Sequence, residues 1–116
     1  MRSSILETIK DYCLVPQETT VFDGQLCAQI NSAFFTLFEL GCSKSPFTIE
    51  DDTSEWTDFT DNPLLLAVVP DYVQQVVKLK FDPPANSFVV NQMKDEITEL
   101  TSRISYAVDP GWEVEE

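Results

Sequence analysis

The sequence predicts a mainly α protein: a small helical bundle of four to five helices with a short β or irregular insert and an extended C-terminal tail. Two observations support this. Apolar residues recur at spacings of three and four along four segments, and residues that begin or end helices stand at the edges of these segments. A chain of 116 residues fits one domain with one core. Residues 1–108 are therefore expected to form a helical domain, and residues 109–116 an acidic tail.

The first helix is expected to begin after Ser3 or Ser4. The Ser4 hydroxyl can cap it, and Glu7 stands three residues later, where it completes a capping box. Pro16 is expected to end the helix. Its apolar stripe consists of Ile5, Leu6, Ile9 and Cys13.

The second helix is expected to run from Asp23, a good N-cap residue, to Gly41, a good residue to follow a helix end. The apolar positions are Leu26, Ile30, Ala33, Phe34, Leu37 and Phe38. Packing in the core explains most of these aromatic side chains. Phe35 does not fit the stripe and is a candidate subunit contact.

Residues 42–61 are irregular and acidic. Within them, Phe47–Ile49 is a candidate short strand. Ser54–Phe59 is a candidate helical turn that points Trp56 and Phe59 inward together, because they stand three residues apart.

Asn62 and Pro63 are expected to start the third helix as its N-cap and first residue. Its expected buried positions are Leu65, Leu66, Val69, Tyr72, Val73, Val76 and Leu79. Pro70 lies inside this pattern, and an interior proline costs about 3 kcal/mol, so a kink or a break is expected there. Residues 81–84, Phe-Asp-Pro-Pro, then predict a rigid extended turn.

The fourth helix is expected over residues 86–107. It carries one apolar stripe on an otherwise polar helix, which suits packing on a neighbour in this chain or in another subunit. The spacing of Glu99 and Arg103 predicts an ion pair on the polar face. The stripe consists of Val89, Met93, Ile97, Leu100, Ile104 and Ala107 or Val108.

Charge excludes several partners. Twenty acidic residues face seven basic ones, which gives a net charge of -13, so DNA and anionic membranes should be repelled. An acidic surface instead suits solubility, a basic partner or a passage through which DNA slides. The N-terminal segment has no apolar stretch typical of a signal peptide, and no run is long enough to cross a bilayer. We therefore expect a protein that acts in the cytoplasm or in a particle assembled there.

Catalytic and metal chemistry have little support. The chain has no histidine, and its three glycines are isolated, so neither a histidine-based catalytic group nor a phosphate-binding loop is indicated. Three separated cysteines favour a reducing compartment and do not complete a zinc site. The densest carboxylates are Asp51, Asp52, Glu55 and Asp58, but a calcium loop starting at Asp51 would need glycine where Trp56 stands. We expect no enzyme, no cofactor and no bound metal.

Four sequence patches, in the order in which they follow one another along the chain, resemble those of the small head-to-tail connector, or adaptor, proteins of long-tailed phages and prophages of Gram-positive bacteria. The most specific patch is the Phe81-Asp82-Pro83-Pro84 turn between two helices. Leu79 and Lys80 precede that turn in the same patch. The other patches are Ser4-Ile5-Leu6 with Thr8-Ile9-Lys10; Phe22-Asp23 with Leu26 and Ile30 to Gly41; and Phe47-Thr48-Ile49 with Trp56 to Phe59. Pro70 departs from the family pattern, in which the third helix is uninterrupted.

The resemblance implies a structural subunit of the virion neck, assembled in the host cytoplasm. It implies a homo-oligomeric ring, with twelve copies expected, under the portal protein. The other face of the ring would meet the next neck or tail component, a stopper or tail terminator, while DNA passes through without specific binding. We add two hypotheses: some of Asp51, Asp52, Glu55 and Asp58 face the channel, and the tail binds a partner surface through Trp112 and Val114.

Two alternatives remain open. A small acidic protein can mimic DNA and inhibit a host nuclease or defence protein, although here the densest carboxylates gather in one segment. The chain can also be another neck or tail-completion protein of the same particle, because ring position cannot be inferred from periodicity.

Overall fold

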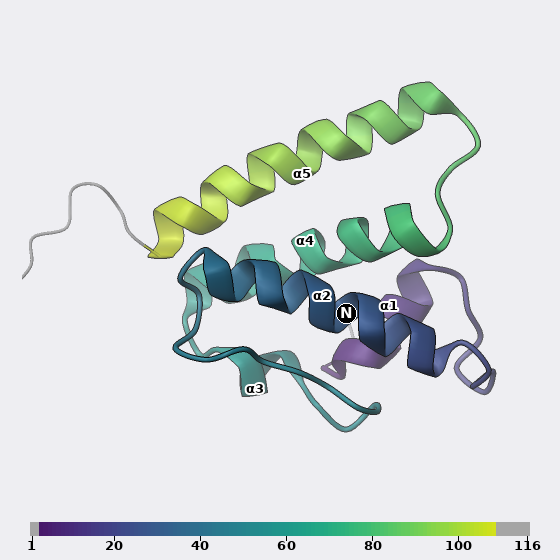
Figure 1. Cartoon of the computed structure of the whole chain (residues 1–116), viewed down its shortest axis with the longest axis horizontal. Helices are drawn as coiled ribbons and strands as arrows, with labels where there is room; N and C mark the ends of the chain where they lie inside the picture. Colours follow the sequence, from purple (N-terminus) through teal and green to yellow (C-terminus); the bar gives the residue numbers. More distant parts are fainter. Residues whose placement is uncertain (1–2, 109–116) are drawn as a thin grey trace, which may run out of the picture.

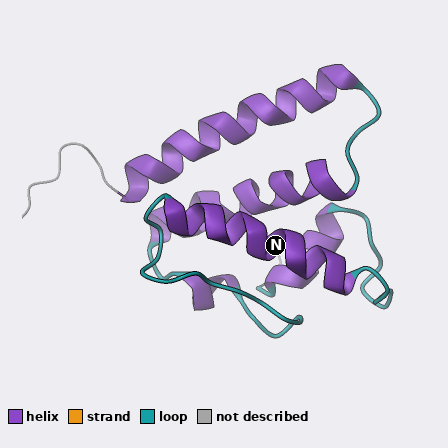
Figure 2. Ribbon diagram, viewed as in Figure 1, coloured by secondary structure: helices purple, strands orange, loops and turns teal. Residues whose placement is uncertain are grey.

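The computed structural model describes residues 3–108, which form a bundle of helices around a central helix, α4 (Figure 1). Helices α1, α2, α3 and α5 all pack against α4, and α1 also packs against α2. Within residues 3–108 there are helices and loops but no strand (Figure 2). The mainly helical fold class is confirmed. The helices are α1 (Ile5–Tyr12), α2 (Asp23–Glu39), α3 (Trp56–Phe59), α4 (Pro63–Phe81) and α5 (Ser87–Val108).

Helix α1 begins at the predicted cap, since Ser4 Oγ accepts a hydrogen bond from the Glu7 backbone N–H at 3.3 Å. It ends earlier than predicted, at Tyr12 rather than at Pro16. Two residues after Tyr12, Leu14 has a positive φ of 63°, which reverses the chain direction before the proline is reached. A left-handed conformation is uncommon for leucine.

The prediction that Asp23 caps α2 is wrong. Phe22 is the N-cap residue and Asp23 is the first helical residue. The Asp23 carboxylate lies instead beside the buried ammonium of Lys10. The predicted end is confirmed: Gly41 has φ 94°, its N–H donates to the Phe38 carbonyl, and the Cys42 N–H donates to the Leu37 carbonyl. These two bonds form a Schellman motif.

The predicted strand at Phe47–Ile49 is also wrong, because no second strand lies beside it in residues 3–108. The side chain of Asn31 takes that place. Its Nδ2 donates to the Ile49 carbonyl at 3.0 Å and its Oδ1 accepts from the Ile49 N–H at 2.8 Å. The inward pointing of Trp56 and Phe59 from α3 is confirmed, since both are buried and both rings contact Phe34.

Helix α4 starts as predicted, with Asn62 Oδ1 accepting from the Leu64 N–H at 2.9 Å and Pro63 in the first turn. It continues through Pro70 without a break, so the break is excluded. The buried face differs slightly from the prediction: Val77 is fully buried, whereas Val76 and Leu79 are only partly covered. Neighbours on several sides of α4 give it a broad buried face that a single stripe does not describe.

Helix α5 runs antiparallel to α4 (Figure 1), beyond a connection of residues 82–86. The turn predicted at residues 81–84 falls here, except that Phe81 is the last residue of α4. The C-terminal half of α5 is packed, with Leu100 and Ile104 buried, whereas Val89 near its start remains 37% exposed. The core thus lies among α1, α2, α4 and the second half of α5. The side chains buried most completely are Phe34, Ile5, Leu6, Ile9, Leu26, Ile30, Leu37, Ile104, Val69, Val73 and Val77.

Candidate functional site: interaction surfaces

The acidic insert between α2 and α4 places its carboxylates on the surface. Asp51, Asp52, Glu55 and Asp58 are all exposed. Asp51 Oδ1 accepts hydrogen bonds from the N–H and hydroxyl of Thr53, which lower the pKa of Asp51, and Asp58 Oδ2 accepts from the Glu55 N–H at 2.8 Å. These contacts give two of the carboxylates a local structural role. Whether any of the four faces a channel stays a prediction.

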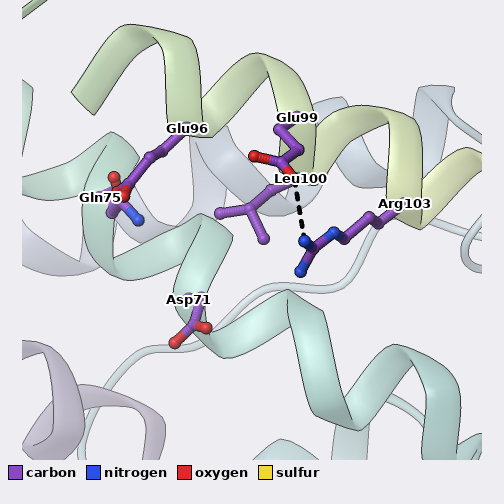
Figure 3. Close-up of a pocket in the computed structure, with 6 residues that line it drawn as sticks. All are labelled: Asp71, Gln75, Glu96, Glu99, Leu100 and Arg103. Atoms are coloured by element: carbon purple, nitrogen blue, oxygen red, sulfur yellow. Dashed lines mark hydrogen bonds and ion pairs between the residues drawn. The ribbon is translucent and has the colours of Figure 1, made fainter. Parts of the chain in front are cut away.

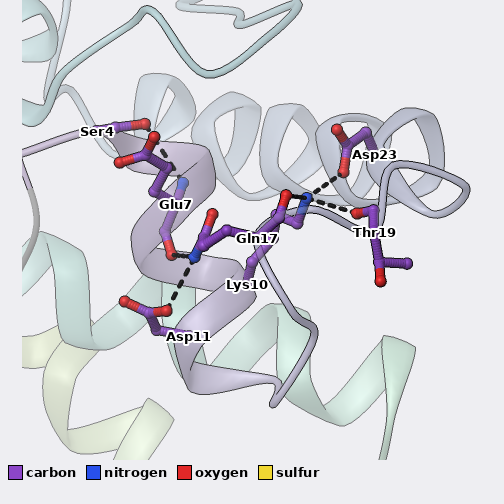
Figure 4. A network of polar contacts seen from close by, with 7 residues as sticks. All are labelled: Ser4, Glu7, Lys10, Asp11, Gln17, Thr19 and Asp23. Carbon is purple, nitrogen blue, oxygen red and sulfur yellow. Dashed lines mark hydrogen bonds and ion pairs between the residues drawn. The ribbon is translucent and has the colours of Figure 1, made fainter.

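The connection between α1 and α2, residues 13–22, is fixed by Lys10 (Figure 4). The Lys10 side chain is only 3% exposed, and its Nζ donates to the Gln17 carbonyl at 3.0 Å and the Thr19 carbonyl at 2.6 Å. Asp23 Oδ1 lies 2.9 Å from the same Nζ, an ion pair outside hydrogen-bond geometry. One buried cation therefore joins α1, the connection and the start of α2.

A second anchor holds the same connection. Gln17 Nε2 donates to the Glu7 carbonyl at 3.0 Å and to Asp11 Oδ1 at 2.8 Å (Figure 4). Gln17 is thereby tied to two turns of α1. The connection is short and is bound to α1 at both Gln17 and Thr19, and its Cys13 and Val15 side chains are buried in the core.

This fixed connection carries exposed apolar side chains. Leu14 is 82% exposed, Val21 78% and Phe22 40%, and the Phe22 ring makes an edge contact with Phe81 at the end of α4, with centroids 5.4 Å apart. We call Leu14, Val21, Phe22 and Phe81 the connection patch. Sequence reasoning missed it. The available signal was that Leu14, Val21 and Phe22 are apolar residues outside every helical stripe.

The opposite end of the molecule is where α2 ends, α4 begins and α5 ends (Figure 1). There a Cβ on Gly41 would lie 3.3 Å from Val108 Cγ1. Exposed apolar side chains at or near this end are Phe35, Leu64 and Tyr106. Phe35, the candidate subunit contact, is 48% exposed, so it is available for one. The tail residues Trp112 and Val114 lie outside the described residues.

An open pocket of about 200 Å³ lies between α4 and α5 (Figure 3). The predicted ion pair is present in its wall, with Arg103 donating to Glu99 Oε2 at 2.8 Å. Gln75 Oε1 is buried and has no hydrogen-bond donor within residues 3–108. Three carboxylates against one guanidinium leave the wall acidic. The lining residues are Asp71, Gln75, Glu96, Glu99, Leu100 and Arg103.

The remaining reactive groups are shielded. Burial raises the pKa of the Cys13 and Cys27 thiols, and it raises that of Cys42 to about 11, so all three are neutral near pH 7. The described part of the chain holds no group of acidic or cysteine side chains suited to a metal ion. None of the described helices is apolar enough over a sufficient length to span a bilayer.

Comparison with known proteins bears on these surfaces. A family profile described as phage connector protein matches residues 5–111, nearly the whole chain. Curated proteins and solved structures give no match. The matched range includes every described helix and both apolar ends. The chain belongs to the phage connector proteins, a structural family of the virion whose members contact other components of the head and tail.

Proposed function

We propose that this chain is the head-to-tail connector subunit of a long-tailed phage or prophage of a Gram-positive host, and that it forms a homo-oligomeric ring in the neck. One face of the ring binds the portal protein and the other binds a stopper or tail terminator. The observation that carries the proposal is the connector-family match over residues 5–111.

The charge supports passage of DNA through such a ring. The net charge of -13 works against binding of phosphates, and the exposed acidic insert adds a surface that DNA would not adhere to. A conduit needs this property, because a basic wall would hold the genome during ejection. The channel hypothesis for Asp51, Asp52, Glu55 and Asp58 belongs to this proposal.

The distribution of apolar surface supports assembly into a ring. Exposed apolar side chains are present at both ends of the molecule, among them the connection patch at one end and Leu64 and Tyr106 at the other; Phe88 and Val89 at the start of α5 are exposed too. Two unlike surfaces on one chain favour head-to-tail contacts between copies, and such contacts close into rings when the rotation permits.

Electron microscopy of particles that carry a gold-labelled tag on this chain tests the proposal. We expect label between capsid and tail. Particles with normal necks and no label would contradict the structural role and would favour the DNA-mimic inhibitor. Competition between the purified chain and DNA for a basic host nuclease would then identify that alternative directly.

A further inference from the structure

We propose that the connection patch of one copy receives the C-terminal segment Trp112–Glu115 of a second copy. This inference rests on the proposed ring, because it identifies the contact that joins neighbouring subunits. It assigns a role to two features that the fold of one chain leaves unexplained. These are an apolar surface held outward and a terminal segment rich in apolar and acidic residues.

The backbone beneath the patch is fixed. Leu14, with φ 63°, stands after the end of α1 in a Schellman motif: its N–H donates to the Asp11 carbonyl and the Val15 N–H donates to the Lys10 carbonyl. This turn buries Val15 and leaves the Leu14 side chain 82% exposed. The Lys10 and Gln17 hydrogen bonds hold the rest of the connection in place. A surface fixed in this way loses little conformational freedom when a partner binds.

The occupant follows from where the described chain ends. Helix α5 ends at Val108, beside Gly41, and the connection patch lies at the other end of α2 and α4. Helix α2 has 17 residues and α4 has 19, so they span about 25 and 28 Å at 1.5 Å per residue.

Trp112 follows Val108 by only four residues, which reach about 14 Å when fully extended. The segment therefore cannot place Trp112 on the patch of its own chain. A second copy, set with its patch end against the end where α5 finishes, brings the two together. The contact is heterologous, because each copy gives its segment at one end and receives another at the opposite end.

The chemistry of the two surfaces matches. Trp112 and Val114 alternate with acidic residues, so an extended segment carries its apolar side chains on one face and its carboxylates on the other. The patch offers the apolar residues Leu14, Val21 and Phe22. At the end of α4, Lys80 is exposed and makes no ion pair within residues 3–108. Tryptophan is a common anchor at protein interfaces.

Chemical cross-linking in assembled particles tests the contact. The double variant Val21→Cys with Val114→Cys is treated with a short bismaleimide, which joins two thiols. We expect a ladder of covalently linked multimers of this chain, whereas each single variant stays monomeric. Cross-linking through the natural cysteines is the background of this experiment, and it is measured on the chain without introduced cysteines. The matched control pairs Val114→Cys with Thr57→Cys, which is exposed on α3 and away from the patch, and should give no ladder.

A second variant separates the contact from folding. Leu14→Asn suits the left-handed backbone better than leucine and removes the apolar side chain. We expect normal unfolding by urea and a tenfold or greater loss of particles with this chain in the neck, as about one buried leucine side chain predicts.

Absence of the ladder in particles whose necks carry the gold label would overturn this inference and leave the connector role intact. Cross-links from residue 114 to another phage protein would overturn it in favour of that partner. Absence of both ladder and neck label would instead remove the proposed function.

Discussion

Lys10 shows how much of the local structure depends on one side chain. Its ammonium is almost wholly buried and is neutralised by Asp23, which is itself 31% exposed at the side chain. Nothing in the spacing of residues 10 and 23 indicates this pair. Asp23 was expected to cap α2 because aspartate is a good N-cap residue, but the buried ammonium of Lys10 outweighs an N–H that water can satisfy.

We predict that Lys10→Met destabilises the fold by about 2–3 kcal/mol, because it leaves Asp23 and two carbonyl groups without their cation. Arg103→Met is the matched control. Its ion pair with Glu99 is 60% and 63% exposed, so the loss should stay within about 0.5 kcal/mol. Urea unfolding followed by circular dichroism measures both. Equal losses for the two variants would contradict the role assigned to Lys10.

Helix α4 contains two prolines in opposite circumstances. Pro63 stands in the first turn, where its missing N–H costs little, whereas Pro70 is buried in the interior of the helix, where the Leu66 carbonyl loses its usual donor. The helix nevertheless continues through Pro70, because the tertiary contacts of α4 on several sides outweigh the local cost. Gln74 Nε2 adds a hydrogen bond to the Pro70 carbonyl at 3.0 Å.

We predict that Pro70→Ala raises the free energy of unfolding by about 1 kcal/mol. The restored hydrogen bond and relieved clash regain up to about 3 kcal/mol, and the lost ring removes about two buried methylene groups at about 0.8 kcal/mol each. Pro63→Ala should change stability by less than about 0.5 kcal/mol, as befits the first turn. Thermal unfolding of the two variants and of the unmodified chain measures these changes in stability. A clear destabilisation by Pro70→Ala would show that packing of the ring dominates.

The helices themselves could be predicted because their signals are local. Ser4, Asn62 and Gly41 act through hydrogen bonds or backbone angles within a few residues, and they lie where the sequence placed them. The strand expected at Phe47–Ile49 could not be predicted from local signals, because a strand requires hydrogen-bond partners elsewhere in the chain. In the structure the Asn31 side chain, not a second strand, forms the hydrogen bonds with Ile49. Within the connection patch, the outward position of Leu14 depends on its left-handed φ, for which leucine gives no sequence signal.

At the scale of the whole molecule, charge and apolar surface oppose each other. Each copy carries a net charge of -13, so copies brought together in a ring repel one another, whereas the connection patch and the apolar residues of the tail favour contact. Assembly should therefore depend on conditions that screen charge without weakening apolar contact.

We predict that neck assembly of this chain on purified, connector-free capsids improves as NaCl rises from about 0.05 to 0.5 M, because the Debye length falls from above 10 Å to below 5 Å over that range. The amount of chain bound per capsid, measured by sedimentation and quantitative gel analysis, checks this. An assembly driven by ion pairs between copies would weaken instead. Leu14→Asn is the matched control: it should bind less at every salt concentration yet keep the same upward trend, because it removes apolar contact and leaves the charge unchanged.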